Sequence, residues 1–127
     1  MEDYLLADET YKIIGILFEV HKILGKGFSE IVYKDALEFE FSENNIPYER
    51  EKEYSVNYKN TVLKHQFYAD FVVYKSIILE IKTVECFNNN HYNQCLNYLK
   101  VSNNELALLV NFNSNSLEYK RFIRTKK

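Results

Sequence analysis

The sequence predicts an α/β protein with a mixed β-sheet flanked by helices, in the order ααβββαβ with a possible final strand. Apolar residues keep helical spacing over the first 45 residues, and the period falls to two from about residue 48. Helical spacing returns over residues 88–101 and is followed by a continuous apolar run. With 127 residues the chain is expected to form a single domain, 1–127, since two would each lack core area.

Two N-terminal helices are expected, the first over residues 3–24 and the second over residues 29–45. Gly25 follows the first, where left-handed backbone is least costly for glycine. Ser29 is a favoured N-cap, and Pro47 enforces an extended exit from the second helix. The inward stripe of that helix is expected to contain Glu30, Tyr33, Leu37 and Phe41.

The middle of the chain reads as three antiparallel strands joined by short turns, the first turn being Lys59-Asn60. A helix and a buried strand follow them, and a last strand is expected at the sheet edge. The expected strands are 53–58, 62–74, 77–84, 105–112 and 117–123, and the expected helix is 88–101.

Asp70 and Glu80 stand on neighbouring expected strands among apolar residues. The strand carrying Glu80 and Lys82 reads as buried on both faces, where a charge is costly unless it is paired or binds a metal. Two carboxylates offer hard oxygen ligands to Mg²⁺ or Mn²⁺, and the metal can activate a bound water. Lys82 would position that water or neutralise developing negative charge, and the Ile81 carbonyl would complete the site.

The register between these two strands decides whether the carboxylates meet. A two-residue turn at Lys75-Ser76 would pair Asp70 with Ile81, on the wrong face. The site therefore requires a three-residue loop over 74–76, which pairs Asp70 with Glu80, or a bulge. Strict alternation would place Phe67, Ala69, Phe71 and Val73 on one face and Tyr68, Asp70, Val72 and Tyr74 on the other.

The helix after the strands presents His91, Gln94 and Tyr98 on one face, which would cover the carboxylates. Gln94 can donate and accept hydrogen bonds, so it suits a metal-bound water or a phosphate, and Tyr98 offers a hydroxyl or a stacking ring. For His91 a substrate role and an ordinary polar role are weighed equally. A tyrosine at such a position is more often a core aromatic, and a first-turn Glu30 more often stabilises the helix dipole.

Composition excludes several classes of protein. Two cysteines, Cys86 and Cys95, are too few for a disulfide framework or a four-cysteine metal site, so reduced thiols are expected. The acidic start is unlike a signal peptide and no apolar run reaches membrane length, so we expect a cytoplasmic protein without membrane contact. The net charge of −2 argues against a tight nonspecific grip on nucleic acid, and setting aside three carboxylates neutralised by metal brings it only to +1.

Four motifs occur in order along the chain: GFSEIVY (27–33), YAD (68–70), EIK (80–82) and HYNQCLNYL (91–99). Taken together, they closely resemble the bacterial GxxExxY protein family, which is grouped with the PD-(D/E)xK nuclease superfamily. The similarity extends from about residue 11 to residue 123. It implies a restriction-endonuclease-like core.

The resemblance also implies roles for individual residues. Asp70 and Glu80 would be metal ligands and Lys82 the catalytic lysine. Glu30 would be the first-helix carboxylate of the superfamily core, which holds a second metal ion or orients a metal-bound water. Gln94 and Tyr98 match the QxxxY motif of RecB-like exonucleases. Ala69 replaces the proline of the motif's name, and the four cysteines that bind an iron–sulfur cluster in some relatives are absent, so no cluster is expected.

The sequence thus predicts a Mg²⁺- or Mn²⁺-dependent nuclease whose substrate is nucleic acid, with DNA the expected polymer. One alternative is a catalytically silent module of the same fold that binds nucleic acid or a partner protein. Another is a hydrolase of a small phosphoester, since no long basic track is evident. The sequence leaves open DNA versus RNA, exonuclease versus endonuclease action, and whether the chain forms a homodimer.

Overall fold

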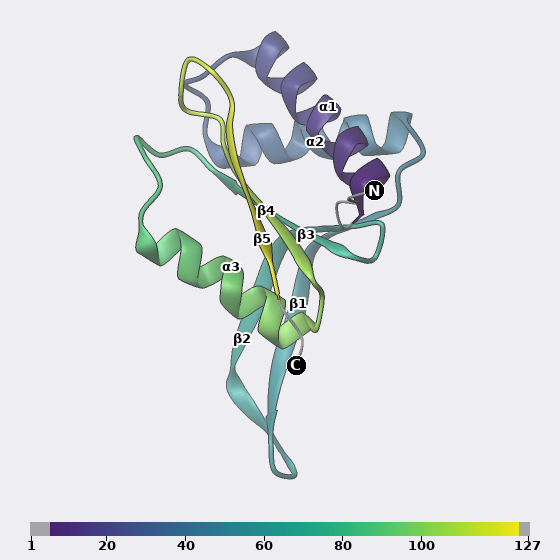
Figure 1. The fold of residues 1–127 in the computed structure, drawn as a ribbon, viewed down its shortest axis with the longest axis vertical. Helices are drawn as coiled ribbons and strands as arrows, with labels where there is room; N and C mark the ends of the chain where they lie inside the picture. The colour runs from purple at the N-terminus through teal and green to yellow at the C-terminus, as the bar shows by residue number, and fades with distance from the viewer. Residues whose placement is uncertain (1–5, 125–127) are drawn as a thin grey trace, which may run out of the picture.

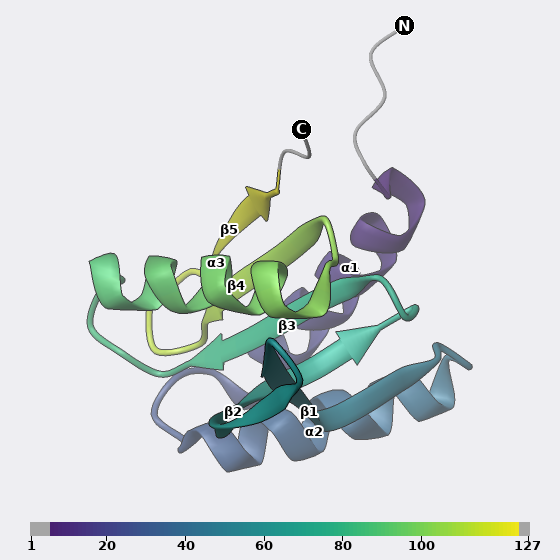
Figure 2. The same cartoon turned by 90° about the horizontal axis from the view of Figure 1, so that it is seen from below.

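The computed structural model describes residues 6–124, in which a five-stranded mixed sheet lies between two helical layers. Helices α1 and α2 cover one face of the sheet and α3 covers the other (Figures 1 and 2). The predicted α/β class and element order are confirmed. The elements are α1 (Ala7–Leu24), α2 (Glu30–Glu43), β1 (Tyr48–Tyr58), β2 (Thr61–Val73), β3 (Ile77–Lys82), α3 (Asn89–Ser102), β4 (Leu106–Asn111) and β5 (Glu118–Ile123).

The strands lie in the order in which they occur in the chain, β1-β2-β3-β4-β5. All neighbouring strands are antiparallel except β3 and β4, which α3 connects as a parallel pair. Val73 pairs with Ile77, so a three-residue loop joins β2 to β3. This is the loop that the candidate site requires. The expected first helix began at residue 3, and its first three residues, 3–5, lie outside the described part of the chain.

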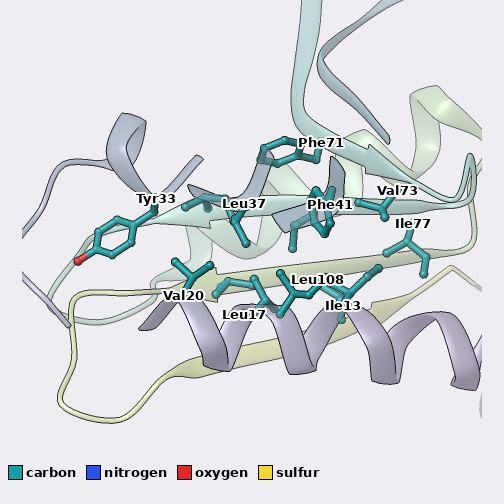
Figure 3. Packing of buried hydrophobic residues seen from close by; sticks show 14 of the residues in the cluster. Ile13, Leu17, Val20, Tyr33, Leu37, Phe41, Phe71, Val73, Ile77 and Leu108 are labelled. Carbon is teal, nitrogen blue, oxygen red and sulfur yellow. The ribbon is translucent and has the colours of Figure 1, made fainter. Parts of the chain in front are cut away.

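Two apolar clusters hold the layers together, one on each face of the sheet. The larger lies between the sheet and helices α1 and α2, where α1 contributes Ile13 and Leu17 (Figure 3). The smaller lies under α3 and includes Cys95 and Leu99. All five residues of β3 from Ile77 to Ile81 are buried, as expected for a strand covered on both faces.

The buried stripe of α2 differs from the expected stripe at its N-terminal end. Tyr33, Leu37 and Phe41 are fully buried as predicted. Glu30 is only half-buried, and Lys34, one turn further on, is buried instead. Ser29 occupies the N-cap position, but its side chain makes no capping hydrogen bond. The sheet face next to α2 therefore receives a lysine where the sequence predicted a glutamate.

Tyr33, the last residue of the GFSEIVY motif, fixes the loop between the first two helices. Its hydroxyl donates to the Gly25 carbonyl at 2.6 Å and accepts from the Phe28 N–H at 3.3 Å. Its ring stacks on Phe112 with centroids 4.4 Å apart. Gly27 has φ of 109°, a conformation that other residues rarely adopt. The glycine and tyrosine of the motif thus have structural roles.

The β1–β2 hairpin projects beyond both helical layers (Figure 1). Its outer part exposes Tyr58, Val62 and Leu63. The helices found in residues 6–124 are all too short or too polar to cross a membrane.

Replacing Tyr33 by phenylalanine should lower the free energy of unfolding by about 1 to 2 kcal/mol. The variant keeps the ring stack but leaves the Gly25 carbonyl and the Phe28 N–H without their partner. Urea denaturation measures the difference. Tyr11→Phe is the matched control, since this exposed tyrosine should change stability by less than about 0.5 kcal/mol. Equal effects of the two substitutions would contradict the structural role of Tyr33.

Candidate functional site

The candidate site forms where the backbone ladder between β2 and β3 stops. The last paired residues are Phe71 and Leu79, and the same register places Asp70 opposite Glu80. At this point hydrogen bonds between carboxylates and backbone N–H groups take the place of the backbone ladder. The Asp70 N–H donates to Glu80 Oε2 at 2.8 Å, and the Ile81 N–H donates to Asp70 Oδ2 at 2.8 Å. The register that the candidate site requires is therefore present, and it comes from the three-residue loop.

The faces of β2 exchange at Asp70, which corrects the strict alternation expected from the sequence. Phe67 and Ala69 pack in the cluster under α3, whereas Phe71 and Val73 pack in the cluster under α1 and α2. These four residues therefore do not share a face. Across the sheet, Glu51 of β1 stands at the position opposite Asp70 and has a left-handed φ of 54°. An irregular backbone conformation at Glu51 of β1 thus lies opposite the change of face.

Lys34 of α2 reaches into the site and was not among the predicted residues. Its ammonium donates to Asp70 Oδ1 at 2.9 Å and to the Glu51 carboxylate. The residue is 8% exposed. Burial lowers the pKa of Lys34, but the hydrogen bonds and charges of Glu51 and Asp70 outweigh it and leave that pKa raised. Lys34 is therefore a charged ammonium that pairs with two carboxylates.

Glu80 is the most deeply buried carboxylate of the site, at 2% exposure. Burial and the charge of Asp70 raise the pKa of Glu80 to about 8, although the Asp70 N–H, Lys82 and Lys34 act in the opposite direction. Without a bound cation this carboxyl therefore holds its proton near neutral pH. Lys82 lies two residues further along β3 and is half-buried.

Helix α3 covers the Glu80 side of the site with Cys95 and Tyr98. Cys95 is fully buried, and burial together with the charge of Glu80 raises the pKa of its thiol to about 12. Tyr98 is 5% exposed and its hydroxyl donates to the Tyr68 carbonyl at 2.7 Å. Burial and the nearby Glu80 and Asp70 carboxylates raise the pKa of Tyr98. Both side chains therefore stay protonated and form a neutral cover.

His91 and Gln94 differ from Tyr98 in their surroundings. His91 is part of the N-terminal capping box of α3, since its Nδ1 accepts from the Asn88 N–H and its own N–H donates to Asn88 Oδ1, both at 3.1 Å. Gln94 is half-buried. The sequence predicted one face for all three residues, and the structure gives the histidine a capping contact and the tyrosine a core contact.

The expected group of three carboxylates does not assemble. No set of three or more histidine, cysteine, aspartate or glutamate side chains within residues 6–124 is placed to hold a metal ion. From α2 it is the Lys34 side chain, not the Glu30 carboxylate, that contacts Asp70. The metal-binding candidates reduce to the Asp70–Glu80 pair. Two carboxylates still fit Mg²⁺, which keeps several waters and is often held by one or two acidic side chains with substrate phosphates.

Comparisons with known proteins agree with this architecture. A family model described as PD-(D/E)XK nuclease superfamily matches residues 7–122. The crystal structure of SSO0001 resembles the chain with a TM-score of 0.59 and 25% sequence identity over 76% of this chain. The match covers 50% of the SSO0001 chain, so this chain spans about half the length of that protein. The search of curated proteins found no match.

Glu80→Gln should make the metal-free protein more stable than wild type at pH 8. The carboxyl has a pKa of 4.5 in its ordinary state and about 8 when folded, so between these values only the unfolded chain loses the proton. Wild-type stability should therefore fall as pH rises through this window, by about 1.4 kcal/mol per pH unit at most. The glutamine keeps an acceptor for the Asp70 N–H and has no such slope.

The comparison requires urea denaturation of both proteins in EDTA from pH 5 to pH 9. Asp8→Asn, an exposed acid in the first turn of α1, is the control and should follow wild type. Parallel pH profiles for wild type and Glu80→Gln would contradict the raised pKa.

Proposed function

Because the chain belongs to the PD-(D/E)XK nuclease superfamily, we propose that it hydrolyses phosphodiester bonds in nucleic acid with a divalent metal ion as cofactor. The observation that carries the proposal is the junction of Asp70 and Glu80, where a half-buried and a buried carboxylate on adjacent strands each accept a backbone N–H of the other strand at the end of a backbone ladder. We propose Mg²⁺ or Mn²⁺ as the ion and DNA as the polymer. The domain is proposed to be single.

Asp70 and Glu80 would hold the ion, which when bound polarises a phosphate oxygen and supplies an activated water. The Asp70 carboxylate is fixed by the Ile81 N–H and Lys34, so its orientation is set before substrate arrives. Lys82, two residues from Glu80 on β3, would stabilise negative charge that develops on the phosphate.

The remaining predicted residues have supporting roles in this proposal. Glu30, one turn before Lys34 on α2, would orient a metal-bound water, and Gln94 would hold substrate or water. Tyr98 supports the site by covering Glu80 and bonding to the Tyr68 carbonyl of β2. His91 would contact substrate while it remains part of the N-terminal capping box of α3. The two free cysteines support a reducing, cytoplasmic location.

Asp70→Asn should lose Mn²⁺ binding and reduce nuclease turnover by at least about 100-fold, because one of the two ligands becomes neutral. Lys82→Met should bind Mn²⁺ normally and lose turnover by a similar factor, because it removes only charge stabilisation. Calorimetric Mn²⁺ titration and cleavage of mixed DNA and RNA substrates, on the same folded samples, measure the two effects.

Lys22→Met and Asp8→Asn are the controls, since both residues are exposed on α1. A folded wild-type protein that binds no Mn²⁺ even with nucleic acid present would rule out the proposed function. Mn²⁺ binding and phosphate-competitive DNA binding without any cleavage would instead identify a catalytically silent member of the fold.

A further inference from the structure

We propose that Lys34 is a permanent, tethered cation of this site, and that it takes the position between Asp70 and Glu51 where a second divalent ion would otherwise bind. The site then accepts one exchangeable divalent ion, held by Asp70 and Glu80. This inference rests on the proposed function, since it specifies how many ions the nuclease site uses.

The contacts of Lys34 are those of a cation in a carboxylate site. Its Nζ lies 2.9 Å from Asp70 Oδ1 and also contacts the Glu51 carboxylate, and its side chain is 10% exposed. The neighbouring Tyr33 and the next-turn Leu37 are fully buried, so α2 holds the lysine in place. On the protein surface, an ion pair would stabilise the fold little, because ordering the lysine side chain costs rotamer entropy. Here it bridges two acids on adjacent strands.

The backbone of β1 brings the second acid to Lys34. Glu51 has φ of 54°, and left-handed backbone is unfavourable for a residue with a Cβ. Such strain is found preferentially at functional sites. The basic residues on either side of Glu51 pair with other acids: Arg50 with Asp35 and Glu38, and Lys52 with Glu49.

Without Lys34, Asp70 and Glu51 would be two carboxylates on adjacent strands that share no positive partner. Such a pair repels itself and offers hard oxygen ligands to a small divalent cation. The lysine ammonium supplies one positive charge and three N–H donors in the same place. Because it is covalently attached, it remains when the exchangeable ion leaves.

The test is a count of Mn²⁺ ions bound per folded full-length chain, by calorimetric titration with the free ion checked by electron paramagnetic resonance. Wild type should bind one ion. Lys34→Met should bind two, because Asp70 and Glu51 become available together. Lys34→Arg should bind one, since it keeps the cation. The double variant Lys34→Met/Glu51→Gln should return to one, because one ligand of the new position is neutral.

Stability provides a second readout. Mn²⁺ should raise the melting temperature of Lys34→Met by more than it raises that of wild type, since the ion replaces the missing charge. A purely structural lysine would give a destabilised Lys34→Met that binds the same number of ions as wild type, and this result would overturn the inference.

The wild-type count also decides the matter if Lys34→Met does not fold. Two ions bound to wild type, or two bound to Lys34→Arg, would overturn the tethered-cation role and leave the proposed function intact. No ion bound to folded wild type would overturn the proposed function itself, so the two failures are distinguishable.

Discussion

The hydrogen bonds of the Asp70 carboxylate and backbone organise the end of the sheet that holds the candidate site. Asp70 accepts from the Ile81 N–H and donates its own N–H to Glu80. These bonds continue the pairing of β2 with β3 at residue 70, beyond the backbone ladder that joins residues 71–73 to β3. A buried N–H without a partner costs about 1 to 3 kcal/mol, so both contacts are needed to keep β2 and β3 joined here. The same contacts fix two carboxylates beside each other. The same hydrogen bonds therefore join the two strands and position the carboxylates of the site.

This arrangement places ionisable side chains in the protein interior, where apolar residues are usual. Glu80 and Lys34 are both nearly excluded from solvent, and desolvation acts against the charged form of each. The two N–H donors and the ammonium compensate in part, and Tyr98 and Cys95 add a neutral cover on the α3 side. Buried ion pairs of this kind are often no more stable than apolar residues of the same size. We infer that the protein gives up some stability of its fold to keep these charged side chains for chemistry, as is common at functional sites.

The sequence predicts the elements, because periodicity is a local property. It states the register that the Asp70–Glu80 site requires, but it leaves open whether a three-residue loop or a bulge supplies that register, and the structure has the loop. Lys34 and Glu51 could not be found in this way. Lys34 follows the motif tyrosine in a helix and reads as a solvated residue, while Glu51 lies in the strongly charged run EREKE, which reads as an exposed strand edge. Their meeting depends on a left-handed residue in β1 and on the packing of α2. One available signal was the spacing of four between Glu30 and Lys34, which places both on one helix face.

The central claim is that the buried charges serve ion binding and not the stability of the fold. The most direct test is the free energy of unfolding of the triple variant Lys34→Met/Asp70→Asn/Glu80→Gln at pH 8, measured by urea denaturation in EDTA and again with Mn²⁺. The variant keeps acceptors for the Ile81 and residue-70 N–H groups. It should be more stable than wild type in EDTA, by about 1 to 4 kcal/mol, and insensitive to Mn²⁺. A triple variant less stable than wild type in EDTA would contradict the claim and show that the charges hold the fold together.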